Sequence, residues 1–247
     1  MGTSTSIPNS MTQHAQGVHA QPPAGAHDQM EALGRFALRS VRPRQVIGLG
    51  TGRAASAFIS ALGHSLLAVR GVPTSRASEE LARSLGIEIA SLADAPKIDF
   101  DFDGADEVDP RLNLIKGYGG ALVREKIVAA SSRKLVILVG EEKLVRKLGA
   151  RGSLPVEVVP FAVPLVTRKI AALGLKPIVR QKDGADFITD NGNLILDCGV
   201  KEIHNPARLD KDLLAIPGVV GTGIFAAMAS IVLVAMKSSE IKTLRPR

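Results

Sequence analysis

The 247-residue chain has no tryptophan, one tyrosine and one cysteine, and each shortage excludes a class of protein. Aromatic residues make up only 3% of the sequence, so the stacking platforms that bind single-stranded nucleic acid are scarce. A single cysteine, Cys198, cannot form an intramolecular disulfide, which favours a reducing compartment. Cys198 falls in an apolar, strand-like segment, where we expect it to pack as an ordinary core residue.

The sequence also lacks segments that target or anchor a protein. No apolar run reaches the roughly 20 residues of a membrane span, and the N-terminus has neither the basic nor the apolar block of a signal peptide. We therefore expect a cytoplasmic protein with no membrane partner. The five histidines form no pair at the spacing of zinc ligands, so we predict no metal site.

The chain does have an excess of positive charge. Lysine and arginine number 31 against 24 acidic residues, and the net charge of +7 favours anionic ligands. Charge alone does not choose among nucleic acid, phosphorylated metabolites and acidic membranes. Because aromatic residues are so scarce, we favour a small phosphorylated ligand and expect no nucleic acid partner.

The order of predicted elements indicates two domains after a polar head. Residues 1–28 show no hydrophobic period, and we expect them to be disordered. From residue 29, strand-like and helix-like segments alternate as far as the continuous apolar run at 134–140, which is typical of a buried parallel strand. This alternation predicts an α/β fold with a Rossmann-like parallel sheet flanked by helices, over residues 29–152 plus 223–247.

Residues 153–222 follow a different order: strand, helix, strand, strand, helix, strand. This is the order of the ferredoxin-like split βαβ unit. We predict one continuous strand over 219–225 at its end. Because the apolar segment 224–236 is expected to rejoin the first sheet, the α+β domain is an insertion.

A glycine-rich turn at residues 48–53, Gly-Leu-Gly-Thr-Gly-Arg, lies where a strand is expected to become a helix. Backbone N–H groups and the positive helix end favour an anion there, whereas the simpler interpretation is a tight connection. A dinucleotide fingerprint would need glycine in place of Arg53, and the chain has no Gly-Lys-Ser/Thr of a P-loop. The arginine favours the anion site.

Acidic residues gather along the predicted strand at 98–103. Alternation places Asp99, Asp101 and Asp103 on one face, and we interpret Asp99 and Asp101 as a half-solvated surface. Asp103 and Asp106 flank a Gly-Ala turn at the carboxyl end of the strand, where α/β sheets bind ligands. These carboxylates suit sugar hydroxyls; magnesium is the competing ligand, although a nearby lysine opposes a cation.

A lysine, a glycine loop and a glutamate follow the acidic turn. Lys116 opens the loop at 117–120, and Glu125 falls on the second turn of the next predicted helix. A glutamate on a helix is most often a solvated charge. Glu125 is flanked by two cations, Arg124 and Lys126, and follows the glycine loop. This combination makes it a candidate general base that acts on a bound polyol.

With these residues in place, the chain resembles ribose-5-phosphate isomerase of the A type from about residue 30 to residue 225. The similar blocks stand in the family's order and are Gly-Leu-Gly-Thr-Gly at 48–52, Gly-Val-Pro-Thr-Ser at 71–75, Asp103–Asp109, Asn-Leu-Ile-Lys-Gly at 113–117, Arg-Glu-Lys at 124–126, Leu-Pro-Val-Glu-Val at 154–158 and Thr-Asp-Asn-Gly-Asn at 189–193. The resemblance implies interconversion of D-ribose 5-phosphate and D-ribulose 5-phosphate in the pentose phosphate pathway. It also implies no metal or organic cofactor, and a homodimer or homotetramer.

The resemblance further implies roles for single residues. Glu125 would move a proton between C2 and C1 through an enediolate, and Lys116 would stabilise the developing oxyanion. Asp103 and Asp106 would orient hydroxyls and assist ring opening. Substrate contacts are expected from Thr51, Gly52, Arg53, Ala54, Gly104, Ala105, Gly117, Tyr118, Gly119 and Lys143.

The chain departs from the family pattern where the phosphate is expected. Arg53 and Ala54 stand where the family usually has Ser-Thr, so two hydroxyl donors are replaced by a guanidinium, which can bind phosphate bidentately. Met30 and Glu31 stand where the first helix usually carries a lysine pair. One cation is lost there and one is gained at Arg53.

Two other functions are compatible with such a fold. A non-catalytic sugar-phosphate sensor would bind its ligand without turnover, but no helix-turn-helix segment precedes the domain. Acyl-coenzyme A transfer would use a glutamate as nucleophile and add mass to the intact protein, which we do not expect.

Overall fold

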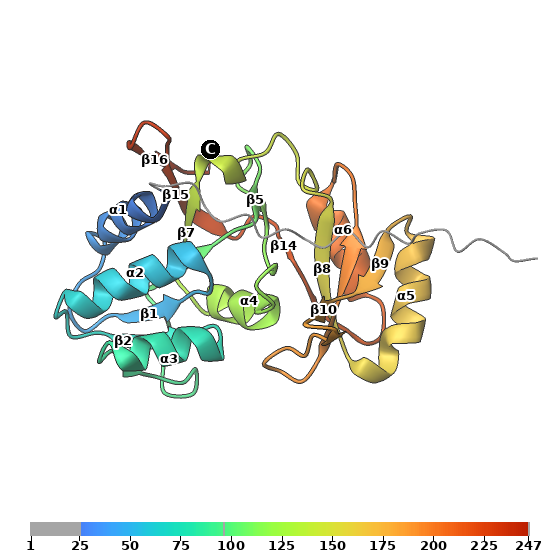
Figure 1. Ribbon diagram of the computed structural model, residues 1–247, viewed down its shortest axis with the longest axis horizontal. Coiled ribbons are helices and arrows are strands. Elements are labelled where there is room, and N and C mark those ends of the chain that lie inside the picture. Colours follow the sequence, from blue (N-terminus) through green and yellow to red (C-terminus); the bar gives the residue numbers. More distant parts are fainter. Residues whose placement is uncertain (1–25, 96, 247) are drawn as a thin grey trace, which may run out of the picture.

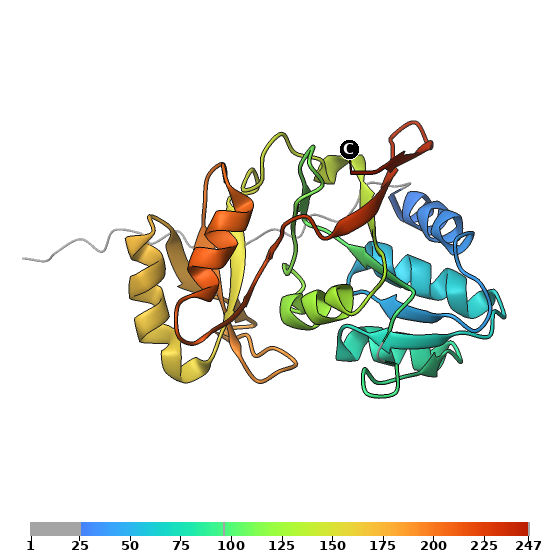
Figure 2. The ribbon, with the colours of Figure 1, turned by 180° about the vertical axis from the view of Figure 1, so that it is seen from behind.

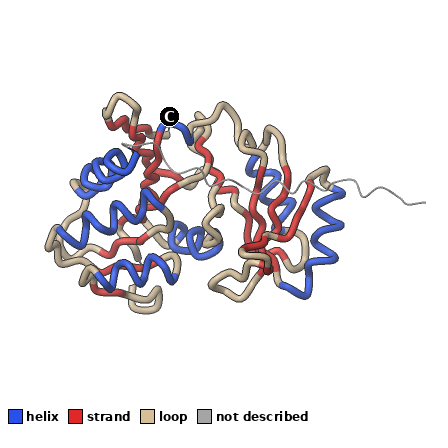
Figure 3. The backbone as a smooth tube through the Cα atoms, viewed as in Figure 1, coloured by secondary structure: helices blue, strands red, loops and turns tan. Residues whose placement is uncertain are grey.

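The computed structural model describes residues 26–95 and 97–246. The predicted disordered head lies outside these residues except for 26–28, which belong to helix α1 (Ala26–Leu38). The helix therefore begins earlier than the sequence pattern indicated. Figures 1 and 3 show a larger lobe that contains α1 and a smaller lobe whose helix α5 (Val163–Ala172) lies at the far end of the molecule.

The larger lobe is built on a seven-stranded sheet in the order β16-β15-β7-β4-β1-β2-β3. Strand β16 (Ile241–Leu244), which the sequence did not predict, pairs antiparallel with β15 at one edge, and the other pairings are parallel. The parallel strands are β1 (Val46–Leu49), β2 (Arg70–Pro73), β3 (Glu88–Ile89), β4 (Phe100–Gly104), β7 (Leu135–Gly140) and β15 (Ala229–Ala235). The predicted Rossmann-like sheet is confirmed, and the strand order reverses between β1 and β4.

Helices cover both faces of this sheet. On one face α1, α2 (Arg53–His64) and α3 (Arg76–Ser84) lie side by side and share an apolar core with the strands (Figure 1). In α2, Phe58 and Leu62 are buried at helical spacing, and Phe58 stacks on Phe102 of β4 with 4.1 Å between ring centroids. Helix α4 (Leu122–Ala130) packs on the opposite face through Val128 and Ala129.

The smaller lobe is a four-stranded antiparallel sheet in the order β13-β8-β12-β9. Its strands are β8 (Ser153–Val158), β9 (Lys176–Val179), β12 (Leu194–Gly199) and β13 (Val219–Thr222), with α5 and α6 (Pro206–Leu214) packed through one apolar core. This is the predicted ferredoxin-like order, and β10 (Gln181–Lys182) with β11 (Ala185–Asp186) adds a short hairpin. We keep 153–222 as the proposed extent of the inserted domain.

A small sheet joins the lobes. It consists of β5 (Glu107–Val108), β6 (Leu114–Ile115) and β14 (Ile224–Phe225), and Figure 2 shows the red segment near the end of the chain, which contains β14, passing from one lobe to the other. The prediction of a single strand over 219–225 is wrong, because the strand is interrupted at Gly223. A Cβ there would lie 2.4 Å from the carbonyl oxygen of Lys116, so the close approach needs glycine. Two short 3-10 helices, η1 (Glu141–Lys143) and η2 (Pro160–Ala162), complete the fold.

The interpretation of Asp101 as half-solvated is wrong. Its side chain is fully buried under α4, and a Cβ on Gly48 of the neighbouring strand would lie 2.6 Å from its Oδ1. Neither carboxyl oxygen has a hydrogen-bond partner among the described residues. Burial, with Asp103 nearby, raises the pKa of Asp101 well above its ordinary value. Asp99, at the sheet margin, accepts a hydrogen bond from the Val46 N–H at 3.0 Å.

This burial predicts a pH-dependent gain of stability for Asp101→Asn. The folded protein keeps the Asp101 proton where the unfolded chain loses it, so the contribution of Asp101 to wild-type stability falls as pH rises above about 4. The variant does not titrate there, and its melting temperature relative to wild type should rise between about pH 4 and pH 7. Thermal unfolding across that range tests it; a pH-independent difference would mean that folded Asp101 is ionised.

Candidate active site

A cavity of about 680 Å³ opens at the carboxyl ends of β1, β4 and β7. This is the point where the strand order reverses, and open α/β sheets bind ligands there. The cavity is bounded by the turn before α2, the turn between β4 and β5, the loop after β6, and η1. Of the predicted site residues, all but Asp103 line it, namely Thr51, Gly52, Arg53, Ala54, Gly104, Ala105, Asp106, Lys116, Gly117, Tyr118, Gly119, Glu125 and Lys143.

Lys116 is the buried cation of the site, with a side chain only 3% exposed. Its Nζ donates to the Gly104 carbonyl oxygen at 2.6 Å and lies 2.9 Å from Asp103 Oδ2 and 3.3 Å from Glu125 Oε2. The first contact is a hydrogen bond and the other two are ion pairs, so the ammonium faces one carbonyl and two carboxylates. Burial alone lowers the pKa of Lys116, but the Asp103 and Glu125 carboxylates raise it above its ordinary value. Lys116 is therefore a permanent cation.

Glu125 lies on the buried face of α4 together with Leu122 and Val128, so it is not a solvated helix charge. Burial raises the pKa of Glu125 to about 8, and the Lys116 ammonium opposes this rise. A carboxylate that titrates near neutrality and lines a cavity is suited to general-base catalysis.

Asp103 lies beneath the cavity and is fully buried. Its Oδ1 accepts hydrogen bonds from the Gly104 N–H at 2.7 Å and the Thr51 N–H at 3.1 Å. A Cβ on Gly50 would lie 2.3 Å from the same oxygen, so the turn after β1 needs glycine at this position. Asp103 thus ties that turn to Lys116.

Asp106 is the acid of this turn that does face the cavity. Its Oδ2 accepts a hydrogen bond from the Tyr118 N–H at 3.0 Å, which links the acidic turn to the glycine loop. Burial raises the pKa of Asp106, whereas the Tyr118 N–H and the Lys116 charge lower it.

Another part of the cavity lining suits an anion. Helix α2 begins after Gly52, whose φ of 98° favours glycine, and among the described residues no side chain caps its first turn. The first N–H groups of α2 are therefore available to a ligand, since the residues that begin the helix line the cavity. Arg53 and Lys143 line the cavity as well; burial lowers the pKa of Lys143, and Asp106 opposes this shift.

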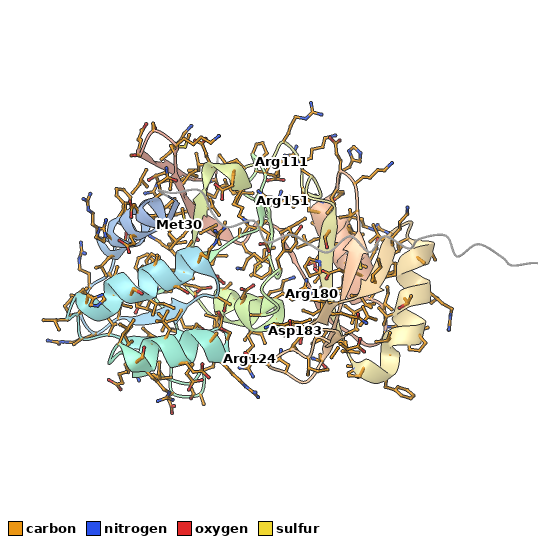
Figure 4. All side chains as sticks on the ribbon, viewed as in Figure 1. Met30, Arg111, Arg124, Arg151, Arg180 and Asp183 are labelled. Carbon is orange, nitrogen blue, oxygen red and sulfur yellow. The ribbon has the colours of Figure 1, made fainter. Side chains whose placement is uncertain are left out.

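Sequence reasoning missed part of the lining. Leu138, Val139 and Gly140 at the end of β7, and Glu142 of η1, also line the cavity. The adjacency of β7 and β4 was the available signal, since parallel strands end at one edge of a sheet. Met30 of α1, which was noted only as a departure from the family pattern, lines it as well (Figure 4).

The residues at 26–95 and 97–246 include no cluster of three or more histidine, cysteine or acidic side chains able to hold a metal ion. Magnesium was the alternative ligand for Asp103 and Asp106, and of these two acids Asp103 is paired with the Lys116 ammonium at 2.9 Å. No helix in the same ranges is long and apolar enough to cross a bilayer.

Comparisons with known proteins agree on one family. The family model for ribose 5-phosphate isomerase A (phosphoriboisomerase A) matches residues 70–239. The chain is 48% identical over 205 residues to ribose-5-phosphate isomerase A of Roseiflexus sp. (strain RS-1), covering 81% of this chain and 88% of that protein. For the protein of the same name from Thermomicrobium roseum, identity is 45% over 215 residues, with 85% and 91% covered.

Solved structures show the same likeness. Ribose 5-phosphate isomerase A from Methanocaldococcus jannaschii superposes with a TM-score of 0.84 at 41% identity, covering 88% of this chain and 98% of that one. A D-ribose-5-phosphate isomerase in complex with phospho-erythronic acid gives a TM-score of 0.85 at 39% identity, with the same coverage.

Proposed function

This chain belongs to the ribose 5-phosphate isomerase A family, and we infer that it interconverts D-ribose 5-phosphate and D-ribulose 5-phosphate. It is an aldose-ketose isomerase of the non-oxidative pentose phosphate pathway. The observation that carries this function in the structure is the buried Glu125–Lys116 pair at the cavity wall, which joins a base to a fixed positive charge. No observation favours the sensor or the acyl-transfer alternative.

Glu125 is the base of the proposed reaction. Its carboxylate takes the proton from C2 of the open-chain aldose, and the electron pair passes through a C1–C2 double bond to the carbonyl oxygen at C1. The hydroxyl proton moves from O2 to O1, and Glu125 returns its proton to C1. The product is the ketose, and neither an oxidant nor a reductant is consumed.

Lys116 supplies charge when the enediolate forms. While Glu125 is ionised, the ammonium is shared among Glu125, Asp103 and the Gly104 carbonyl. Once Glu125 has taken the proton it is neutral, and its attraction for Lys116 weakens. An ammonium N–H can then turn to the substrate oxygen on which negative charge has just appeared. This supply of charge needs no metal ion or organic cofactor.

We propose that the remaining site residues hold the substrate. The N-terminus of α2, Arg53 and Lys143 bind the phosphate, and Asp106 accepts a hydrogen bond from a sugar hydroxyl. Asp103, being sealed from the cavity, positions Lys116 instead. We also propose a cytoplasmic location and, from the family resemblance, a homodimeric or homotetrameric assembly, which light scattering on the purified protein tests.

Replacing Glu125 with glutamine should abolish turnover and leave affinity for ribose 5-phosphate within about tenfold, because the amide keeps the shape and loses the base. Isomerase assays and calorimetric titration measure the two effects, with exposed Glu80→Gln as the control. Lost binding would make Glu125 structural. A wild-type protein that binds the sugar phosphate without turnover would favour the sensor.

The raised pKa of Glu125 predicts the pH dependence of the reaction. The base must be ionised in the free enzyme, so kcat/KM should rise with pH to a plateau with its midpoint near 8. The substrate phosphate titrates at about pH 6, so a rise in kcat/KM above about pH 7 reflects ionisation of a group on the enzyme. A pH profile in which Glu125 titrates near its ordinary value of 4.5 would contradict the assignment.

Replacing Arg53 with serine tests the phosphate end. The variant loses a cation beside the α2 N-terminus, so KM for ribose 5-phosphate should rise about tenfold, with kcat nearly unchanged. Unphosphorylated ribose provides the control, since its kcat/KM should not respond to this change. An unaltered KM for the phosphorylated sugar would place the phosphate elsewhere.

A further inference from the structure

Arg180, which follows β9 on the smaller lobe, reaches the glycine loop formed by Gly117, Tyr118 and Gly119 (Figure 4). Its Nε and Nη2 donate to the Asp197 carboxylate at 2.7 and 2.6 Å, a bidentate pair that fixes the guanidinium plane. Its Nη1 donates to the carbonyl oxygens of Gly117 at 2.9 Å and Tyr118 at 3.1 Å. The side chain is only 13% exposed, so these contacts are well shielded from water.

These two carbonyls fix where the following amide groups point. In a planar trans peptide, the C=O and the next N–H point in opposite directions. With the Gly117 carbonyl turned toward Arg180, the Tyr118 N–H points away from it and donates to Asp106 at 3.0 Å. By the same geometry the Gly119 N–H points away from Arg180. Gly119 is exposed and lines the cavity, and its N–H bonds to none of the described residues.

The smaller lobe holds the rest of the loop as well. The Tyr118 hydroxyl donates to the Ser153 carbonyl oxygen at 3.1 Å. The ring of Phe187 lies against Gly120, where a Cβ would be 2.4 Å from the ring, and Gly120 has a φ of 89°. The Arg180 guanidinium lies 5.9 Å from the centroid of the same ring. The inserted lobe therefore sets the conformation of a loop that belongs to the larger lobe.

We propose that Arg180 is a positioning residue for the isomerase reaction, because it turns the Gly119 N–H into the cavity as a donor to the enediolate oxygen. This proposal rests on the proposed function. The Lys116 ammonium already donates to the Gly104 carbonyl and pairs with two carboxylates, so a second donor would add stabilisation at the oxyanion. That donor interacts more strongly with the charged enediolate oxygen than with the neutral carbonyl oxygen of the substrate. Loss of this alignment should therefore lower kcat more than it raises KM.

Kinetics of Arg180→Ala, Arg180→Lys and Asp197→Asn test the proposal, with exposed Arg168→Ala on the same lobe as the control. Loss of one oxyanion donor typically lowers kcat by about a hundredfold, and we expect about that for Arg180→Ala, with KM within about threefold. The lysine variant should recover part of the rate, since an ammonium can still donate to a carbonyl but cannot form the bidentate pair. Asp197→Asn should fall between the alanine variant and wild type. Melting temperatures identify variants that do not fold.

The affinity for phospho-erythronic acid provides a readout that general loosening would not reproduce. Its carboxylate carries negative charge where the enediolate does, so its dissociation constant in Arg180→Ala should rise in parallel with the fall in kcat/KM. An alanine variant with wild-type kcat, or with equal weakening of substrate and analogue, would overturn the proposal. If the wild type itself does not turn over, the proposed function fails, and the analogue affinities still decide whether Arg180 aligns an anion-binding amide.

Discussion

The buried ammonium of Lys116 is the positive charge that balances the buried carboxylates at the carboxyl end of the parallel sheet. It connects the Gly104 carbonyl at the end of β4 to Glu125 on α4, and it neutralises Asp103 beneath the cavity. Without it, two carboxylates would be buried with no countercharge, which is strongly destabilising. Helix α4 can therefore lie over an acidic strand face only because Lys116 is there. The same burial raises the pKa of Glu125 to about 8.

Three carboxyl groups on this face differ because their partners differ. Asp103 accepts two backbone N–H groups and pairs with Lys116, so its charge is fully compensated. Glu125 has only the shared ammonium and borders the cavity, so it can gain and lose a proton during a reaction. Asp101 has no hydrogen-bond partner among the described residues, and burial raises its pKa well above the ordinary value. Different hydrogen-bond partners thus distinguish the acid that we propose to position Lys116, the proposed base and an unpaired buried acid.

Sequence reasoning succeeded where the signal was local or ordered along the chain. The strand and helix alternation and the split βαβ order predicted the sheets, and the family resemblance, carried by motifs such as the glycine turn, supplied most of the cavity lining. It failed where the burial or conformation of a residue depends on an element that is distant in the sequence. Alternation shows that Asp101 and Asp103 share a face, but only the packing of α4 buries that face. Similarly, Gly223 ends a strand because it touches Lys116, and Arg180 acts on a loop more than sixty residues earlier in the chain.

Two parts of the cavity lining differ in their electrostatic environment. Lys116 and Glu125 are about as buried as core residues, so salt screens their interaction little. Arg53 is exposed, and among the described residues no side chain caps α2, so in the proposed site the helix N–H groups and a guanidinium replace the hydroxyls that the family resemblance leads one to expect. Met30, where a lysine was expected, adds no charge. In this proposal the phosphate is bound by the more exposed part of the lining, while the charges proposed to act on the reacting carbons are shielded from solvent.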